Sequence, residues 1–184
     1  YKEAVGRFLN HSTANHSFEE IEHIVNSKDE IKEIGTILKK AHTCKDRYPL
    51  AWTHFFKRRA ISSISIEELR SVNPSVYAKT QCYYEDYEYL VKHEKRAVNR
   101  FLGTTPKEYS FEDIKKIAKA KEQIKVYGDI LRKAYQCKDN YPLTWKVFSQ
   151  GRTMSKIPMD ELKLVKPKIF ARKEIFLPVF TAQE

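Results

Sequence analysis

The chain has 184 residues, of which 41% are hydrophobic and 12% aromatic, so it can bury a core and is not disordered throughout. No stretch is long and apolar enough to cross a membrane, and the first residues do not resemble a secretory signal. The formal net charge is +10, which favours a polyanionic partner, most often nucleic acid.

A long internal repeat sets the order of the predicted elements. An ungapped shift of 93 positions aligns residues 4–79 with 97–172, and about 34 of the 76 pairs are identical. Few glycines and abundant Lys, Glu, Leu and Ile favour helices. We therefore predict an all-α fold, made by tandem duplication of one unit of about five short helices, with units at 1–82 and 97–172.

The first three helices of each unit are predicted from helix-capping residues and from the spacing of apolar residues. A short amphipathic segment at 4–9 is followed by Ser17 with an acid three residues later, which is a capping-box pattern. The longest helix is expected over 28–43, where apolar residues recur at helical spacing. Gly35 in its middle, like its counterpart Gly128, indicates a close helix crossing at which a Cβ would clash.

The stretch Cys44–Trp52, repeated as Cys137–Trp145, is interpreted as a turn between the third and fourth helices. Its Cys, Tyr and Trp side chains are assigned to the core. Pro49 is expected to begin the fourth helix, since proline has no amide hydrogen to lose there. That helix is expected to run to Arg59, and its counterpart to Arg152, so that each would end in cations.

Residues 83–96 connect the units and are rich in tyrosine and acid. With no Gly or Pro before residue 103, one helix is expected over 83–102. The apolar tail, 173–184, is expected to fold back on a unit, or to meet a protein partner or a second copy. Aromatic side chains suit interface cores, so the candidate partner-binding residues are Tyr83, Tyr84, Tyr87, Phe176 and Phe180.

Charge is divided unevenly between the two copies. Residues 4–79 carry 12 basic and 9 acidic side chains, whereas residues 97–172 carry 17 and 8. The second copy is therefore expected to dominate non-specific affinity for nucleic acid, because lysines and arginines neutralise phosphates. A basic surface kept only for solubility is the alternative.

The leading hypothesis is a non-enzymatic nucleic-acid-binding protein or region, most of all for duplex DNA. Cations at the end of the fourth helix would face a groove or backbone, as in helix-turn-helix-like units, or would simply complement the helix dipole. Lysines beside the repeated tyrosine would present charge to a phosphate. The candidate nucleic-acid-binding residues are Lys45, Lys57, Arg58, Arg59, Lys115, Lys116, Lys119, Lys138, Lys146 and Arg152.

Other function classes have weaker support. Three cysteines do not make a disulfide framework, which favours an intracellular protein of the cytoplasm or nucleus. We expect no metal site, cofactor or active site, because metal-ligand spacings, glycine-rich phosphate loops and nucleophile motifs are lacking. A protein-interaction module, as an adaptor or inhibitor, is the second hypothesis. The accessory targeting region of a larger enzyme is the third.

Overall fold

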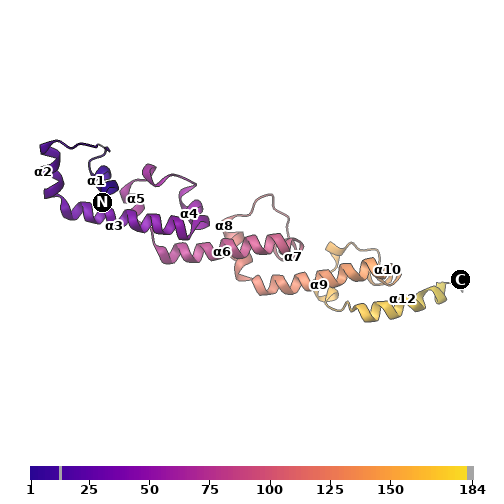
Figure 1. Ribbon diagram of the computed structural model, residues 1–184. Helices are drawn as coiled ribbons and strands as arrows, with labels where there is room; N and C mark the ends of the chain where they lie inside the picture. The colour runs from indigo at the N-terminus through magenta and orange to yellow at the C-terminus, as the bar shows by residue number, and fades with distance from the viewer. Residues whose placement is uncertain (13, 182–184) are drawn as a thin grey trace. The chain divides into compact units, whose positions relative to one another are not determined.

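The computed structural model describes the backbone of residues 1–12 and 14–181, with side chains up to residue 177 (Figure 1). Within these ranges every regular element is a helix and no strand occurs, which confirms the predicted all-α class. The chain divides into two compact units, Tyr1–Tyr84 and Glu85–Glu184.

Unit 1 is built around its longest helix, α3. Helices α1, α2, α4 and α5 pack on α3 (Figure 1). The predicted core positions Ile31, Ile34, Leu38 and Ala41 of α3 are all buried. The elements are α1 (Lys2–Phe8), α2 (Phe18–Asn26), α3 (Lys28–Arg47), α4 (Pro49–Phe56), the 3₁₀ turn η1 (Ile61–Ser63), α5 (Ile66–Arg70) and the first part of α6 (Pro74–His93).

Unit 2 is built in the same way around α9, on which α7, α8, α10, α11 and α12 pack. The bounds of α8, α9, α10 and η2 lie 93 residues after those of α2, α3, α4 and η1. Besides the end of α6, the elements are α7 (Lys95–Leu102), α8 (Phe111–Lys119), α9 (Lys121–Asn140), α10 (Pro142–Ser149), η2 (Met154–Lys156), α11 (Met159–Leu162) and α12 (Pro167–Thr181).

The predicted capping boxes start α2 and α8. The Ser17 hydroxyl accepts from the Glu20 amide at 3.2 Å, and the Glu20 carboxylate accepts from the Ser17 amide at 2.9 Å. Ser110 and Asp113 make the same two bonds at 3.2 and 3.1 Å. Each box satisfies amides that the first helical turn leaves without partners, so the prediction is confirmed.

The turn predicted for the Cys–Trp stretch is shorter than expected. Helix α3 continues through Arg47, and only Tyr48, with φ −130° and ψ 61°, separates it from α4. The helix extends because Cys44 follows Ala41 on the buried side, and it stops because Pro49 disfavours helical geometry in the residue before it. The core positions of Cys44 and Trp52 are confirmed, since both are buried, and Pro49 begins α4 as predicted.

The fourth helix of each unit is also shorter than predicted. Helix α4 ends at Phe56 because Lys57 and Arg58 adopt left-handed conformations, with φ of 48° and 65°. Helix α10 ends in the same way before Gln150, at φ 51°. The predicted helical run to Arg59 and Arg152 is therefore wrong, and the cations after α4 lie in a tight turn.

The single helix expected over 83–102 is divided at Glu94. Helix α6 ends at His93 and α7 begins at Lys95, with Glu94 at φ −127° and ψ 34° between them. The Glu94 carboxylate lies where a Cβ on Gly128 would be, and it also pairs with Arg132 at 2.9 Å. The clash predicted at Gly128 is confirmed. The one predicted at Gly35 is wrong, because a Cβ there would make ordinary contacts of 3.5 Å or more.

A side chain from a later helix caps each of α4 and α10, from α6 and α12 respectively, which the sequence did not indicate. The Gln81 side-chain oxygen accepts from two first-turn amides of α4 at 3.0 and 3.2 Å. The Glu174 carboxylate accepts from the amides of Leu143 and Thr144 at 3.2 and 2.7 Å. Residues 81 and 174 are 93 positions apart, so the capping plan recurs although one residue is neutral and the other acidic.

The Glu174 cap is expected to make unit 2 sensitive to acid. Burial raises the pKa of Glu174, but the hydrogen bonds from Thr144 and Leu143 outweigh this and hold the pKa below its ordinary value of 4.5. A lowered pKa means that the stabilisation is present above the unfolded pKa and is lost as pH falls through the folded pKa. Glu174→Gln, which imitates Gln81, should flatten the fall in unfolding free energy below about pH 4.5, measured by urea unfolding across pH. An unchanged pH profile would contradict this role.

Candidate functional site

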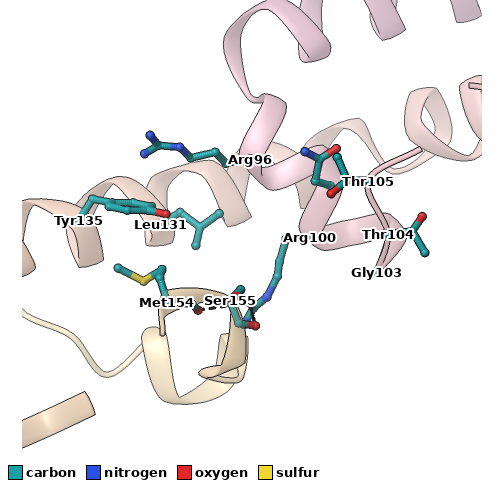
Figure 2. Close-up of a pocket in the computed structure, with 10 residues that line it drawn as sticks. Arg96, Arg100, Gly103, Thr104, Thr105, Leu131, Tyr135, Met154 and Ser155 are labelled. Atoms are coloured by element: carbon teal, nitrogen blue, oxygen red, sulfur yellow. Dashed lines mark hydrogen bonds between the residues drawn. The ribbon is translucent and has the colours of Figure 1, made fainter. Parts of the chain in front are cut away.

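The candidate site is a hollow of about 480 Å³ in unit 2, bordered by α7, the loop after it, α9 and η2 (Figure 2). Two of its lining residues are arginines, and none is Asp or Glu. The polar side chains that line it are Arg96, Asn99, Arg100, Thr104, Thr105 and Ser155. The hollow therefore collects positive charge and neutral hydrogen-bonding groups.

Arg96 is held in place by an aromatic ring. Figure 2 shows its guanidinium above the ring of Tyr135, and the distance from Cζ to the ring centroid is 4.3 Å. A stacked guanidinium uses its face for the ring and keeps its N–H donors in the plane of the group. Arg96 is exposed, so these donors remain accessible to an oxygen-rich ligand.

Arg100 fixes the opposite wall of the hollow. Its guanidinium donates hydrogen bonds to the backbone oxygens of Met154, at 3.3 Å, Ser155 and Ile157. Figure 2 shows the side chain directed from α7 toward Met154 and Ser155. Because these acceptors are neutral carbonyls, Arg100 anchors η2 without losing its net charge to a carboxylate.

Unit 1 has a hollow at the corresponding place with different chemistry. The charged residues that line this hollow, of about 630 Å³, are Lys2, Glu3 and Arg7. Arg7 donates to a carbonyl of η1 as Arg100 does to η2. Glu3 and His42 stand 93 positions before Arg96 and Tyr135. The Glu3 carboxylate lies 3.1 Å from Nε2 of His42, where unit 2 has a cation stacked on a ring.

Sequence reasoning missed Arg96 and Arg100. Arg100 carries a signal, since an arginine also stands 93 positions earlier, at Arg7. The exchange of the pair Glu3 and His42 for Arg96 and Tyr135 is the second signal. The sequence alone does not show that this exchange concerns one site, because only tertiary packing brings residues 96 and 135 together.

The predicted lysines of α8 form what we name the α8 strip, on the helix face opposite the buried residues. Lys115 is partly buried, 3.6 Å from the Glu112 carboxylate, whereas Lys116 and Lys119 are exposed and form no ion pair with a described residue. The equivalent face of α2 has no lysine or arginine. The α8 strip consists of Glu112, Lys115, Lys116 and Lys119.

Arg59 and Arg152 are engaged within their own units. Arg152 makes two hydrogen bonds to the Glu161 carboxylate, at 3.1 and 2.7 Å, and Arg59 pairs with Glu68 in the same way. The hydrogen bond from Arg152 lowers the pKa of Glu161, as expected for a carboxylate beside a fixed cation. These two arginines hold the chain after α4 and α10, and their charge is compensated.

The other predicted cations are spread over the surface. Lys45, Lys57, Arg58, Lys138 and Lys146 are all exposed. Tyr48 and Tyr141 follow Lys45 and Lys138 by three residues. Both tyrosines are half-buried and pack against the unit cores. The structure therefore does not bring a free tyrosine face together with these lysines, as base stacking would require.

Two of the predicted partner-binding tyrosines are engaged inside the units. The Tyr84 hydroxyl lies 3.0 Å from Nδ1 of His54 in unit 1. The Tyr87 ring meets Tyr109 in unit 2, with the ring centroids 5.2 Å apart. Tyr83 is half-buried. These contacts explain the tyrosine-rich sequence by packing.

The tail contributes an apolar groove. Phe176 is 61% exposed and, with Val147 and Phe170, lines a groove of about 280 Å³ between α10 and α12. The side chain of Phe180, which was also predicted to bind a partner, lies outside the described residues.

Comparison with known protein families, curated proteins and solved structures finds no match. Among the described residues, no cluster of three or more His, Cys, Asp or Glu is placed to hold a metal ion. None of the described helices has the length and apolar character needed to cross a membrane. The site must therefore be interpreted from its own residues.

Proposed function

We propose that this chain is a nucleic-acid-binding protein or region that contacts phosphates, of duplex DNA above all, mainly through unit 2. One observation carries the proposal. The hollow of unit 2 is lined by Arg96 and Arg100 and by no carboxylate, whereas the Glu3 carboxylate lines the hollow of unit 1. Uncompensated cations in a hollow with neutral hydrogen-bond donors favour an anionic ligand.

The chemistry available is backbone recognition. The in-plane N–H groups of Arg96 match phosphate oxygens, and the lysines of the α8 strip add point charges. Duplex DNA carries one charge about every 1.7 Å along its axis. Cations that are spread over a surface should therefore bind a duplex more tightly than a single strand. Helix α4 ends before its neighbouring cations, so a recognition helix that reads bases is not part of the proposal.

The proposal includes the tandem duplication of one helical unit. It is supported by about 34 identities in an ungapped alignment, and by helix bounds, capping boxes and arginine anchors that recur at the same spacing. After duplication, the second copy would have gained cations at the hollow and on α8. This divergence makes unit 1 a built-in comparison for unit 2.

Substituting Arg96 tests the proposal at its central residue. Arg96→Gln should lower duplex-DNA affinity about tenfold and reduce the slope of log K against log salt by about one, because one phosphate contact is lost. The double variant Arg96→Glu, Tyr135→His places the unit 1 pair in unit 2 and should lower affinity further. Fluorescence anisotropy with a labelled duplex measures both quantities.

The control for this test is Arg47→Gln, which removes one exposed cation from unit 1. It should change affinity less than about twofold if the hollow, rather than total charge, governs binding. Equal losses for Arg96→Gln and Arg47→Gln would refute a specific role for the hollow.

A protein-interaction module is the second candidate function, supported by the groove between α10 and α12. Val147 and Phe176 are 62% and 61% exposed, so the groove offers apolar area to a partner. Lys173 also lines it, which suits a helix with an apolar face and an acidic flank.

A further inference from the structure

Unit 1 leaves the apolar face of α2 uncovered. Phe18, Ile21 and Val25 are 80%, 48% and 64% exposed. Their spacing of three and four residues places them on one side of the helix. Ile24 is half-buried against the core of unit 1, and the His23 ring meets Phe8 with centroids 4.7 Å apart. The face of α2 that carries these three large apolar residues is therefore left exposed by the described residues.

The equivalent face of α8 is covered. Ile114 and Ala118, the counterparts of Ile21 and Val25, are 5% and 8% exposed. Ile117 is fully buried in the core of unit 2. The same helix with the same apolar spacing is therefore exposed in one unit and buried in the other.

The last part of α6 contacts the residues that flank α8 on both sides. Tyr87 meets the ring of Tyr109, just before α8, and Asp86 forms an ion pair with Lys121, just after it. Leu90 is fully buried in the same core cluster as α8. The α6 stretch thus meets both flanks of α8 and shares a core cluster with Ile117, and it presents an acid, an aromatic residue and an apolar residue in order.

Unit 1 has a lysine at the position that corresponds to Lys121 of unit 2. Lys28 follows α2 as Lys121 follows α8, because both begin the next helix. Lys28 is exposed and forms no ion pair with a described residue, whereas Lys121 is paired with Asp86. The uncovered face thus has an apolar stripe and, at its end, a cation in the position that takes an acid in unit 2.

We propose that Phe18, Ile21, Val25 and Lys28 form a docking surface for an amphipathic helix supplied by another molecule. The helix would present the pattern of residues 86–91 of α6, with an acid followed by an aromatic residue and, one turn later, by apolar residues. The acid would pair with Lys28 while the aromatic and apolar residues cover α2. This surface belongs to unit 1, so it is independent of the proposed nucleic-acid function of unit 2.

A peptide with the sequence of residues 83–93 is the probe for this surface. The labelled peptide should bind the full chain saturably in an anisotropy titration. Ile21→Lys should weaken binding at least about tenfold, because a charge would be placed in the centre of the apolar face. Val126→Lys is the matched control, since Val126 is similarly exposed, at 53% against 48% for Ile21, but lies on α9, and it should leave peptide binding unchanged. Both side chains are exposed, so both variants should fold, as far-UV circular dichroism would verify.

A charge exchange tests the predicted orientation. Lys28→Asp should weaken binding of the wild-type peptide, and the peptide carrying Asp86→Lys should restore it. Failure of the wild-type peptide to bind would overturn the proposal, and so would equal binding to the Ile21→Lys chain. Self-association of the chain that depends on Ile21 but is not inhibited by the peptide would also overturn it, because a different surface of a second copy would then be the occupant.

Discussion

Reversing the three lysines of the α8 strip to glutamate is expected to lower duplex-DNA affinity at least about 100-fold at about 50 mM salt. Each lysine that contacts a phosphate releases a counterion, and glutamate adds repulsion to the lost contact. The slope of log K against log salt should fall by about three, because three contacts are removed. The side chains lie opposite the buried face of α8, so the fold should be kept.

The control for this reversal is a triple variant of unit 1 with the same change in net charge. Lys28, Lys39 and Lys40 are exposed, and their reversal to glutamate should lower affinity only a few-fold through long-range charge. Comparable losses in the two triple variants would show that net charge alone governs binding, and would reject unit 2 as the interface.

Trp145→Ala is expected to have the largest effect on stability, about 3–5 kcal/mol. Trp145 is 7% exposed and packs on Phe148 and Phe170, with ring centroids 5.4 and 6.3 Å apart. Truncation removes this buried apolar area and leaves a cavity between α10 and α12. A lower midpoint in urea unfolding, followed by far-UV circular dichroism, measures the loss.

The variant Trp145→Phe tests whether an aromatic ring of smaller size can retain part of the packing that Trp145→Ala removes. It keeps a ring in the core and should lose no more than about half as much stability as Trp145→Ala. An unfolding midpoint for Trp145→Ala equal to that of the wild type would show that the Cys–Trp stretch is not part of the core of unit 2.

Local signals in the sequence predicted most helix starts. Ser17, Ser110 and Pro49 each act on amides within their own first turn, so their effect needs no distant residue. The core of α3 follows in the same way from apolar spacing. Helix ends were predicted less well. Just after the left-handed turn at Lys57, Arg59 pairs with Glu68, which lies in another element and is not visible from the local sequence.

The candidate site was predicted only in part. The surplus of lysines on α8 is visible in the sequence when residues 97–172 are compared position by position with residues 4–79. The hollow was not predicted, since Arg96 and Tyr135 come from different helices and meet through tertiary packing. The same reason explains why the caps made by Gln81 and Glu174 were not foreseen, as each acts on a helix about 30 residues earlier.

The most direct test of the central claim is a titration of the full chain with duplex DNA at several salt concentrations. The proposed function predicts binding tighter than about 10 µM at about 50 mM salt, with log K falling linearly as log salt rises and the duplex preferred to a single strand. Weaker binding, or a log K that does not change with salt, would contradict nucleic-acid binding by this chain.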